Sequence, residues 1–117
     1  MKVTDLMIGD FVKCREQDCG GHRVDYISEM DDEVGVDGEI LDLNMIFPIP
    51  LTPEILEKNG FGFGGGYIYK LDDSQMVIEY SYGFLFGWVF CHKKQLNYVH
   101  ELQHVLRLCG IEKEIIL

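Results

Sequence analysis

The sequence has few basic residues and no long hydrophobic run. Only 10 Lys and Arg are present against 20 Asp and Glu, which gives a formal net charge of −10 at pH 7. A surface of that charge repels a phosphate backbone, so the composition disfavours direct binding to nucleic acids. No segment reaches the roughly 18 consecutive apolar residues that a membrane-spanning helix needs, and we therefore expect no membrane span.

The beginning of the sequence has no apolar segment typical of a signal peptide. Residues 1–5 include Lys, Thr and Asp, so the pattern indicates a cytoplasmic protein. In that compartment thiols stay reduced, and we expect four free cysteines rather than two disulfide bonds. These residues are Cys14, Cys19, Cys91 and Cys109.

Length and composition indicate one ordinary globular domain. The 117 residues are 47% hydrophobic and 26% charged, which is typical of a chain that folds around one core. No repeat or linker divides the sequence. We therefore predict a single domain over residues 1–117.

The first half of the sequence is predicted to consist mainly of strands. Residues 6–14 form a turn that leads into a strand, and a second strand is expected over His22–Ser28. An Asp-Gly pair at 37–38 lies between strand-like residues 33–36 and 39–43, which is a strong signal for a two-residue hairpin turn. These strands predict an antiparallel sheet that is strongly curved or barrel-like over the N-terminal half.

A short helix is predicted over residues 52–59. Its first residues, Thr-Pro-Glu, provide a capping hydroxyl, a proline that loses no hydrogen bond and an acid near the positive end of the helix dipole. Gly60 follows where a left-handed helix stop belongs.

A longer helix is predicted near residues 96–109, followed by an edge strand over residues 111–117. The helix prediction rests on apolar residues that recur at three- and four-residue spacing, namely Val99, Leu102, Leu106 and Cys109. The predicted fold class is therefore α+β, with one short and one longer helix packed on an antiparallel sheet.

Residues 60–66 contain five glycines and two phenylalanines, and we predict a loop there. Phosphate-binding glycine loops follow a strand and open a helix, whereas this segment follows the predicted short helix. The order favours a mobile loop or a flexible contact surface over a nucleotide site. Strands are expected after it over residues 67–71, 75–82 and 84–91.

Aromatic residues occur at every second position of the later strands. Strand geometry would place all of them on one face if no turn intervened. Such a row could stack single-stranded bases or grip a partner, but we expect it to pack against the longer helix as part of the core. Alternatively, Gly83 turns the chain and divides the rings between two strands. The row consists of Tyr80, Tyr82, Phe84, Phe86, Trp88 and Phe90.

Residues 100–104, His-Glu-Leu-Gln-His, match the HExxH pattern of zinc hydrolases. In that pattern two histidines bind the metal and the glutamate activates its water. Helical projection places both histidines nearly opposite the apolar stripe, so we expect them to face solvent. The downstream Gly and third His of the extended motif are absent. A solvated helix face is favoured, and a zinc hydrolase with ligands His100 and His104 and catalytic Glu101 is the alternative.

Cys14, Cys19 and His22 could supply three of the four ligands of a structural zinc site. No fourth ligand lies nearby in the sequence. Cys91 or His92 could complete the set only if their strand lay alongside. We therefore favour ordinary loop cysteines and no cofactor, with zinc as the alternative.

Half of the acidic residues lie between Arg23 and Lys58, where no basic residue occurs. In this block Asp31, Asp32 and Glu33 are candidate interaction residues, because they could mimic nucleic-acid phosphates in the basic groove of a host enzyme. Their spacing does not match that of a calcium-binding loop. The favoured interpretation is a solvated acidic face.

Three segments of the sequence resemble a known group of proteins. They are Leu6-x-Ile8-Gly9-Asp10-x-Val12, the run from Pro48 to Phe61, and Tyr98-Val99-His100-Glu101-Leu102-Gln103. In this order they resemble a family of small uncharacterised proteins carried by prophages and mobile elements of gut anaerobes. The family has no assigned activity, so the resemblance implies a genomic neighbourhood and an accessory or host-interaction role, and no catalytic residue. The segment from Cys14 to His22 departs from the family pattern.

The sequence contains no convergent set of nucleophile, base and orienting group. We therefore predict a non-catalytic protein-interaction module or accessory protein of a mobile element, with a protein as its partner. The alternatives are an acidic inhibitor that mimics a nucleic acid and a zinc-dependent hydrolase. The oligomeric state stays open.

Overall fold

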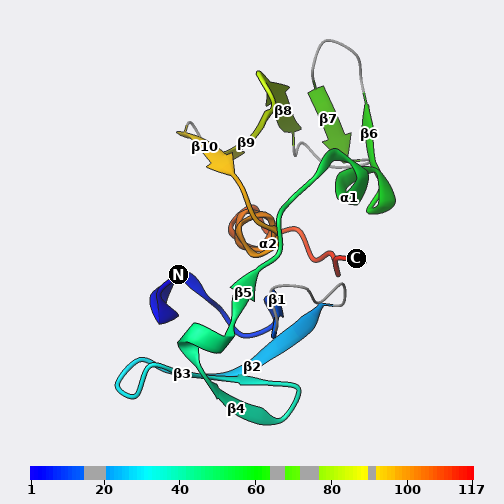
Figure 1. Ribbon diagram of the computed structural model, residues 1–117. Coiled ribbons are helices and arrows are strands. Elements are labelled where there is room, and N and C mark those ends of the chain that lie inside the picture. Colours follow the sequence, from blue (N-terminus) through cyan, green and yellow to red (C-terminus); the bar gives the residue numbers. More distant parts are fainter. Residues whose placement is uncertain (15–20, 64–67, 72–76, 90–91) are drawn as a thin grey trace. The chain divides into compact units, whose positions relative to one another are not determined.

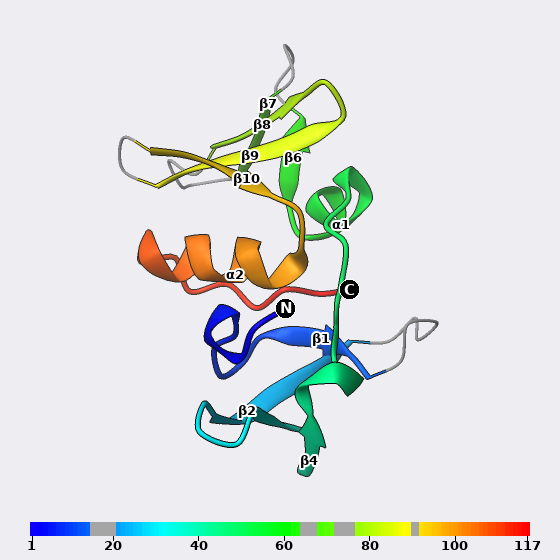
Figure 2. The same ribbon diagram turned by 60° about the vertical axis from the view of Figure 1, so that its left-hand side comes forward.

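The computed structural model describes residues 1–14, 21–63, 68–71, 77–89 and 92–117. These residues form two compact units, Met1–Ile49 and Pro50–Leu117. Each unit contains an antiparallel five-stranded sheet, and the described α-helices belong to the second unit (Figures 1 and 2). The predicted α+β class is confirmed, and the single domain stays a prediction.

The sheet of the first unit has the strand order β4-β3-β2-β1-β5. Its inward side chains are mostly valines, which suit a half-buried pleated surface. In the strands that the structure describes, neither sheet closes or curls strongly, so the predicted barrel-like half is not confirmed. The strands are β1 (Phe11–Lys13), β2 (His22–Ser28), β3 (Glu33–Val36), β4 (Glu39–Asp42) and β5 (Phe47–Pro48), with 3₁₀ turns η1 (Val3–Asp5) and η2 (Leu43–Met45).

The predicted hairpin turn at Asp37-Gly38 is confirmed. Val36 pairs with Glu39, and the two turn residues have φ values of 51° and 85°. A two-residue turn of this kind needs positive φ at both positions, which glycine and aspartate tolerate better than bulkier residues. The bounds of β2 also agree with the predicted strand over His22–Ser28.

The sheet of the second unit has the strand order β10-β9-β8-β7-β6, so consecutive strands are neighbours throughout. Helix α2 packs against β9 and β10, and α1 packs against β6. No helix among the described residues is long and apolar enough to cross a membrane. The elements are α1 (Pro53–Lys58), β6 (Phe61–Phe63), β7 (Ile68–Leu71), β8 (Val77–Ser81), β9 (Phe84–Val89), β10 (His92–Leu96) and α2 (Val99–Leu108).

The predicted capping of the short helix is confirmed. Thr52 Oγ1 accepts a hydrogen bond from the Ile55 amide at 3.3 Å, and Pro53 occupies the first turn. Gly60 ends the helix with a φ of 86°. Sequence signals at both ends therefore fix this helix, as expected from capping chemistry.

Three segments of the second unit differ from their predictions. Strand β6 lies inside the predicted glycine loop, of which residues 64–66 lie outside the described residues. Strand β10 precedes α2, so the longer helix begins at Val99. The predicted strand over residues 111–117 is wrong, because that segment has no regular secondary structure.

The buried side chain of Asn59 anchors the end of the C-terminal segment, which joins no sheet. Asn59 Nδ2 donates to the carbonyl oxygens of Ile55 and Ile116, and Asn59 Oδ1 accepts from the Ile116 amide at 2.6 Å. The amide group of Asn59 thus acts as a peptide unit would in a strand pair. Because Asn59 supplies these bonds, residues 111–117 need no alternating strand pattern of their own to be held in place.

Candidate interaction surface

The sheet of the second unit has an exposed aromatic side, which we call the outer face. On β9, Phe84 and Trp88 are 52% and 44% exposed, whereas Leu85 between them is 4% exposed. Strand alternation places the rings on one side and Leu85 on the other. The cross-strand register assigns further residues to the same side as the rings. The outer face comprises Ile68, Lys70, Val77, Glu79, Ser81, Phe84, Phe86, Trp88, Lys93 and Gln95.

The prediction that this aromatic row packs against the longer helix is wrong for Phe84 and Trp88. The side of β9 that is buried carries Leu85 and Gly87. A Cβ atom on Gly87 would lie 2.9 Å from Leu96 Cδ1, so the chain approaches closely there. Large rings do not fit into such a gap, so the side of β9 that carries the smaller side chains faces inward.

Gly83 does divide the aromatic row, as the alternative interpretation held. Tyr82 and Gly83 have φ values of 53° and 82° and form the turn between β8 and β9, where Ser81 pairs with Phe84. Tyr80 is half-buried, and Tyr82 is 97% exposed at the turn. Phe90 lies outside the described residues.

The outer face also holds a cation. Lys93 on β10 reaches across β9, so that its Nζ lies 4.5 Å from the ring centroid of Phe86 and 2.5 Å from Oε2 of Glu79 on β8. Glu79 and Phe86 are direct cross-strand partners, so the carboxylate and the ring lie side by side. The Oε2 atom is buried and accepts no hydrogen bond from the described residues, although the Glu79 side chain as a whole is 36% exposed, and such an oxygen is costly without a compensating charge. The lysine ammonium supplies that compensation.

Sequence reasoning missed Glu79 and Lys93 because it did not predict β10. Without that strand, Lys93 has no register and nothing relates it to Glu79. The alternation of β9 is the signal that could have found them. If the rings face outward, an antiparallel strand paired with β9 must place every second side chain on the same side as the rings. The structure gives this pairing as Lys93 with Trp88 and Gln95 with Phe86.

The two histidines of the HExxH segment lie on α2, but the prediction that both face solvent is wrong. His100 is 4% exposed, and its ring stacks on Tyr98 at 5.7 Å between centroids. His104 is half-buried, with its ring 5.6 Å from that of His100. The helix buries side chains around more than half of its circumference, so the apolar stripe alone did not define its buried side.

Glu101 has a structural role at the beginning of α2. Its Oε1 accepts hydrogen bonds from the amides of Asn97 and Tyr98, at 2.9 and 3.0 Å. This is the reach-back of a helix N-terminal glutamate, which also suits the helix dipole. Across the described ranges, no three His, Cys, Asp or Glu residues are placed to hold a metal ion. Zinc hydrolysis here stays a prediction.

The Cys14, Cys19 and His22 cluster is described only in part. Cys14 is half-buried and packs against the valine core, and Cys19 lies outside the described residues. His22 Nδ1 lies 2.7 Å from Asp37 Oδ2. The predicted zinc site therefore stays a prediction, as do free thiols at Cys19 and Cys91, whereas Cys109 is an exposed free thiol.

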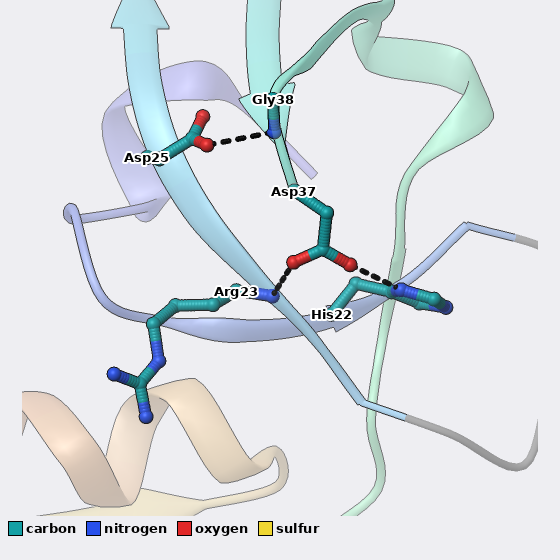
Figure 3. Close-up of polar contacts among 5 residues, drawn as sticks. All are labelled: His22, Arg23, Asp25, Asp37 and Gly38. Carbon is teal, nitrogen blue, oxygen red and sulfur yellow. Dashed lines mark hydrogen bonds and ion pairs between the residues drawn. The ribbon is translucent and has the colours of Figure 1, made fainter.

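Several carboxylates of the acidic block stabilise turns of their own unit (Figure 3). Asp25 Oδ2 accepts from the Gly38 amide at 2.8 Å, and Asp37 accepts from His22 Nδ1 and the Arg23 amide. Aspartate commonly bonds nearby backbone amides in this way. Asp25 and Asp37 are thus engaged in local structure.

The three candidate interaction acids lie around the turn from β2 to β3. Asp31 Oδ2 accepts from Ser28 Oγ at 3.2 Å, and Asp32 has a positive φ of 53°. Glu33 is half-buried in β3 and pairs with Asp42 in the register. Asp31 and Asp32 are exposed, so phosphate mimicry stays a prediction.

Known proteins give no further guide to this surface. No family model matches the chain, and neither a curated protein nor a solved structure matches it.

Proposed function

We propose that this chain is a non-catalytic protein-binding module and that the outer face is its contact surface. The observation that carries the proposal is the exposure of Phe84 and Trp88 on a strand whose opposite side is buried. Aromatic residues are enriched at protein interfaces, where their burial supplies much of the binding energy. Contiguous exposed apolar surface is a common mark of such a site.

A protein partner suits this surface better than a nucleic acid does. Stacking of bases on aromatic rings is normally combined with several cations that neutralise phosphates. On the described outer face the cations are Lys70 and Lys93, and Lys93 is already paired with Glu79. The net charge of −10 adds a long-range repulsion of polyanions.

Quantitative capture from lysate with matched variants tests the proposal. Trp88→Ala removes the largest ring of the outer face. Tyr82→Asn is the control, because it removes an exposed ring from a turn where asparagine is favoured. We expect the same proteins to be retained by the wild type and the control, and retained about tenfold less by Trp88→Ala. Equal capture by all three chains would show that the outer face is not the contact surface.

A further inference from the structure

The chemistry of the partner can be inferred from the cation that the outer face already holds. We propose that Glu79 and Phe86 form a binding subsite for an ammonium or guanidinium group, which Lys93 fills in the absence of a partner. The partner is then a basic protein segment whose Lys or Arg side chain replaces Lys93. This inference rests on the proposed function of the outer face and specifies what binds there.

The subsite combines two attractions for a cation. The Phe86 ring presents its negative face to the ammonium at 4.5 Å, and the Glu79 carboxylate supplies the opposite charge at 2.5 Å. The two groups come from paired positions of adjacent strands, so the sheet fixes them relative to each other. Because a buried carboxylate oxygen is costly without an opposite charge, the subsite should be more stable with a cation bound than empty. One cation is therefore expected to be exchanged for another.

Lys93 can be displaced because of its own chemistry and exposure. Its side chain is 41% exposed and has a flexible four-carbon stem. An incoming guanidinium would stack on Phe86 and form a bidentate pair with Glu79, which an ammonium cannot do. Exchange therefore favours an arginine of the partner over the lysine of the chain.

A second exposed ring lies beside the subsite and could take a second basic side chain. Trp88 lies two residues beyond Phe86 on β9, about 7 Å along the strand, and is exposed. That distance matches alternate residues of an extended chain, so two basic residues could contact both rings. The net charge of −10 would also speed the encounter with a basic partner.

The test uses the 117-residue chain and three synthetic probes: acetyl-Arg-Ser-Arg-Ser-Arg-amide, the same peptide with Glu in place of Arg, and a short oligothymidylate. Trp88 is the only tryptophan, so its fluorescence reports on the outer face, and calorimetry gives an independent affinity. Lys93→Ala empties the subsite. Lys94→Ala is the matched control, because it removes the same charge from the adjacent position, which pairs with Gly87 on the other side of the sheet.

We expect the Arg peptide to bind the Lys93→Ala chain about fivefold more tightly than the Lys94→Ala chain, because no internal cation competes with it. Glu79→Gln should weaken binding of the same peptide about fivefold relative to the wild type. The inference would be overturned if the Arg peptide bound Lys93→Ala more weakly than Lys94→Ala. It would also be overturned if the Glu peptide or the oligothymidylate bound more tightly than the Arg peptide, or if the Arg peptide showed no saturable binding. Those results leave the proposed function standing if Trp88→Ala still reduces capture about tenfold relative to the wild type.

Discussion

The two units use their polar and aromatic residues differently. Met1–Ile49 contains twelve acidic and four basic residues, a net charge of −8, whereas Pro50–Leu117 contains eight and six, a net charge of −2. In the first unit Asp25 and Asp37 bond backbone amides of a hairpin. In the second unit Phe84 and Trp88 lie exposed on one side of a sheet. Charges build local structure in both units, since Glu101 does so at the beginning of α2, but the exposed aromatic surface suited to binding lies in the nearly neutral second unit.

Exposed apolar residues occur in both units, but their kinds differ. In the first unit Ile40 on β4 and Tyr26 on β2 lie exposed on one side of the sheet, across Gly35. In the second unit two exposed rings, Phe84 and Trp88, flank the half-buried Phe86 on one side of β9. The denser row of rings is why we assign the binding surface to the second unit.

The largest expected effect comes from two neighbouring substitutions on β9. Leu85→Ala removes a buried side chain and should lower the free energy of unfolding by about 3 kcal/mol. Phe84→Ala removes more atoms but from the exposed side, and should cost less than about 1 kcal/mol. Urea unfolding of both variants, followed by Trp88 fluorescence, measures the difference. If Phe84→Ala were the more destabilising change, the assignment of the outer face would be reversed.

A smaller effect is expected at a glycine of the first unit. A Cβ on Gly35 would lie 2.5 Å from Tyr26 Cβ and 2.6 Å from Asp25 Oδ1. Gly35 pairs with Tyr26 beside a bulge in β2, so the obstacle includes backbone that cannot move independently. Gly35→Ala should therefore destabilise the first unit by about 2 kcal/mol.

The matched control for Gly35 lies in the other sheet. In β6 a Cβ on Gly62 would meet nothing closer than 4.0 Å, so Gly62→Ala should change stability by less than about 0.5 kcal/mol. Hydrogen exchange of the Val24 amide, which donates to Asp10, reports on the first unit. Equal protection of Val24 in both variants would contradict the close contact at Gly35.

Local chemistry made several elements predictable from the sequence. The turn at Asp37-Gly38 and the cap at Thr52 depend on residues within three or four positions of each other, and both are confirmed. The hairpin at Gly83 was recognised as one of two options, because glycine permits the turn without requiring it. Such signals do not depend on the rest of the fold.

Burial and long-range pairing could not be predicted in the same way. Alternation along β9 separates Phe84 from Leu85, but both are apolar, so the pattern does not say which side is covered. The buried side is decided by the fit between Gly87 and Leu96, which belong to different strands. Ile116 is anchored by Asn59 in a way the sequence did not indicate for a similar reason: the two residues are 57 positions apart.

The smallest expected effect is a loss of stability at alkaline pH that is confined to the second unit. Tyr69 lies on the buried side of β7, and burial raises the pKa of its phenol, with further contributions from the charges of Glu57, Tyr80 and Glu54. A raised pKa in the folded state means that the unfolded chain loses its proton first. Stability should therefore be complete below about pH 10 and fall as the pH rises through the folded-state pKa of Tyr69.

Tyr69→Phe should remove this part of the pH dependence, because phenylalanine has no proton to lose. Melting temperatures followed by Trp88 fluorescence between pH 8 and 11 would then fall less steeply for the variant than for the wild type, by a few degrees at most. Tyr26→Phe in the first unit is the control and should retain the wild-type slope, since its ring is exposed on β2. Identical slopes for all three chains would mean that burial on the inner side of the sheet does not raise the pKa of the Tyr69 phenol. The two sides of this sheet would then differ less in solvent access than their exposures indicate.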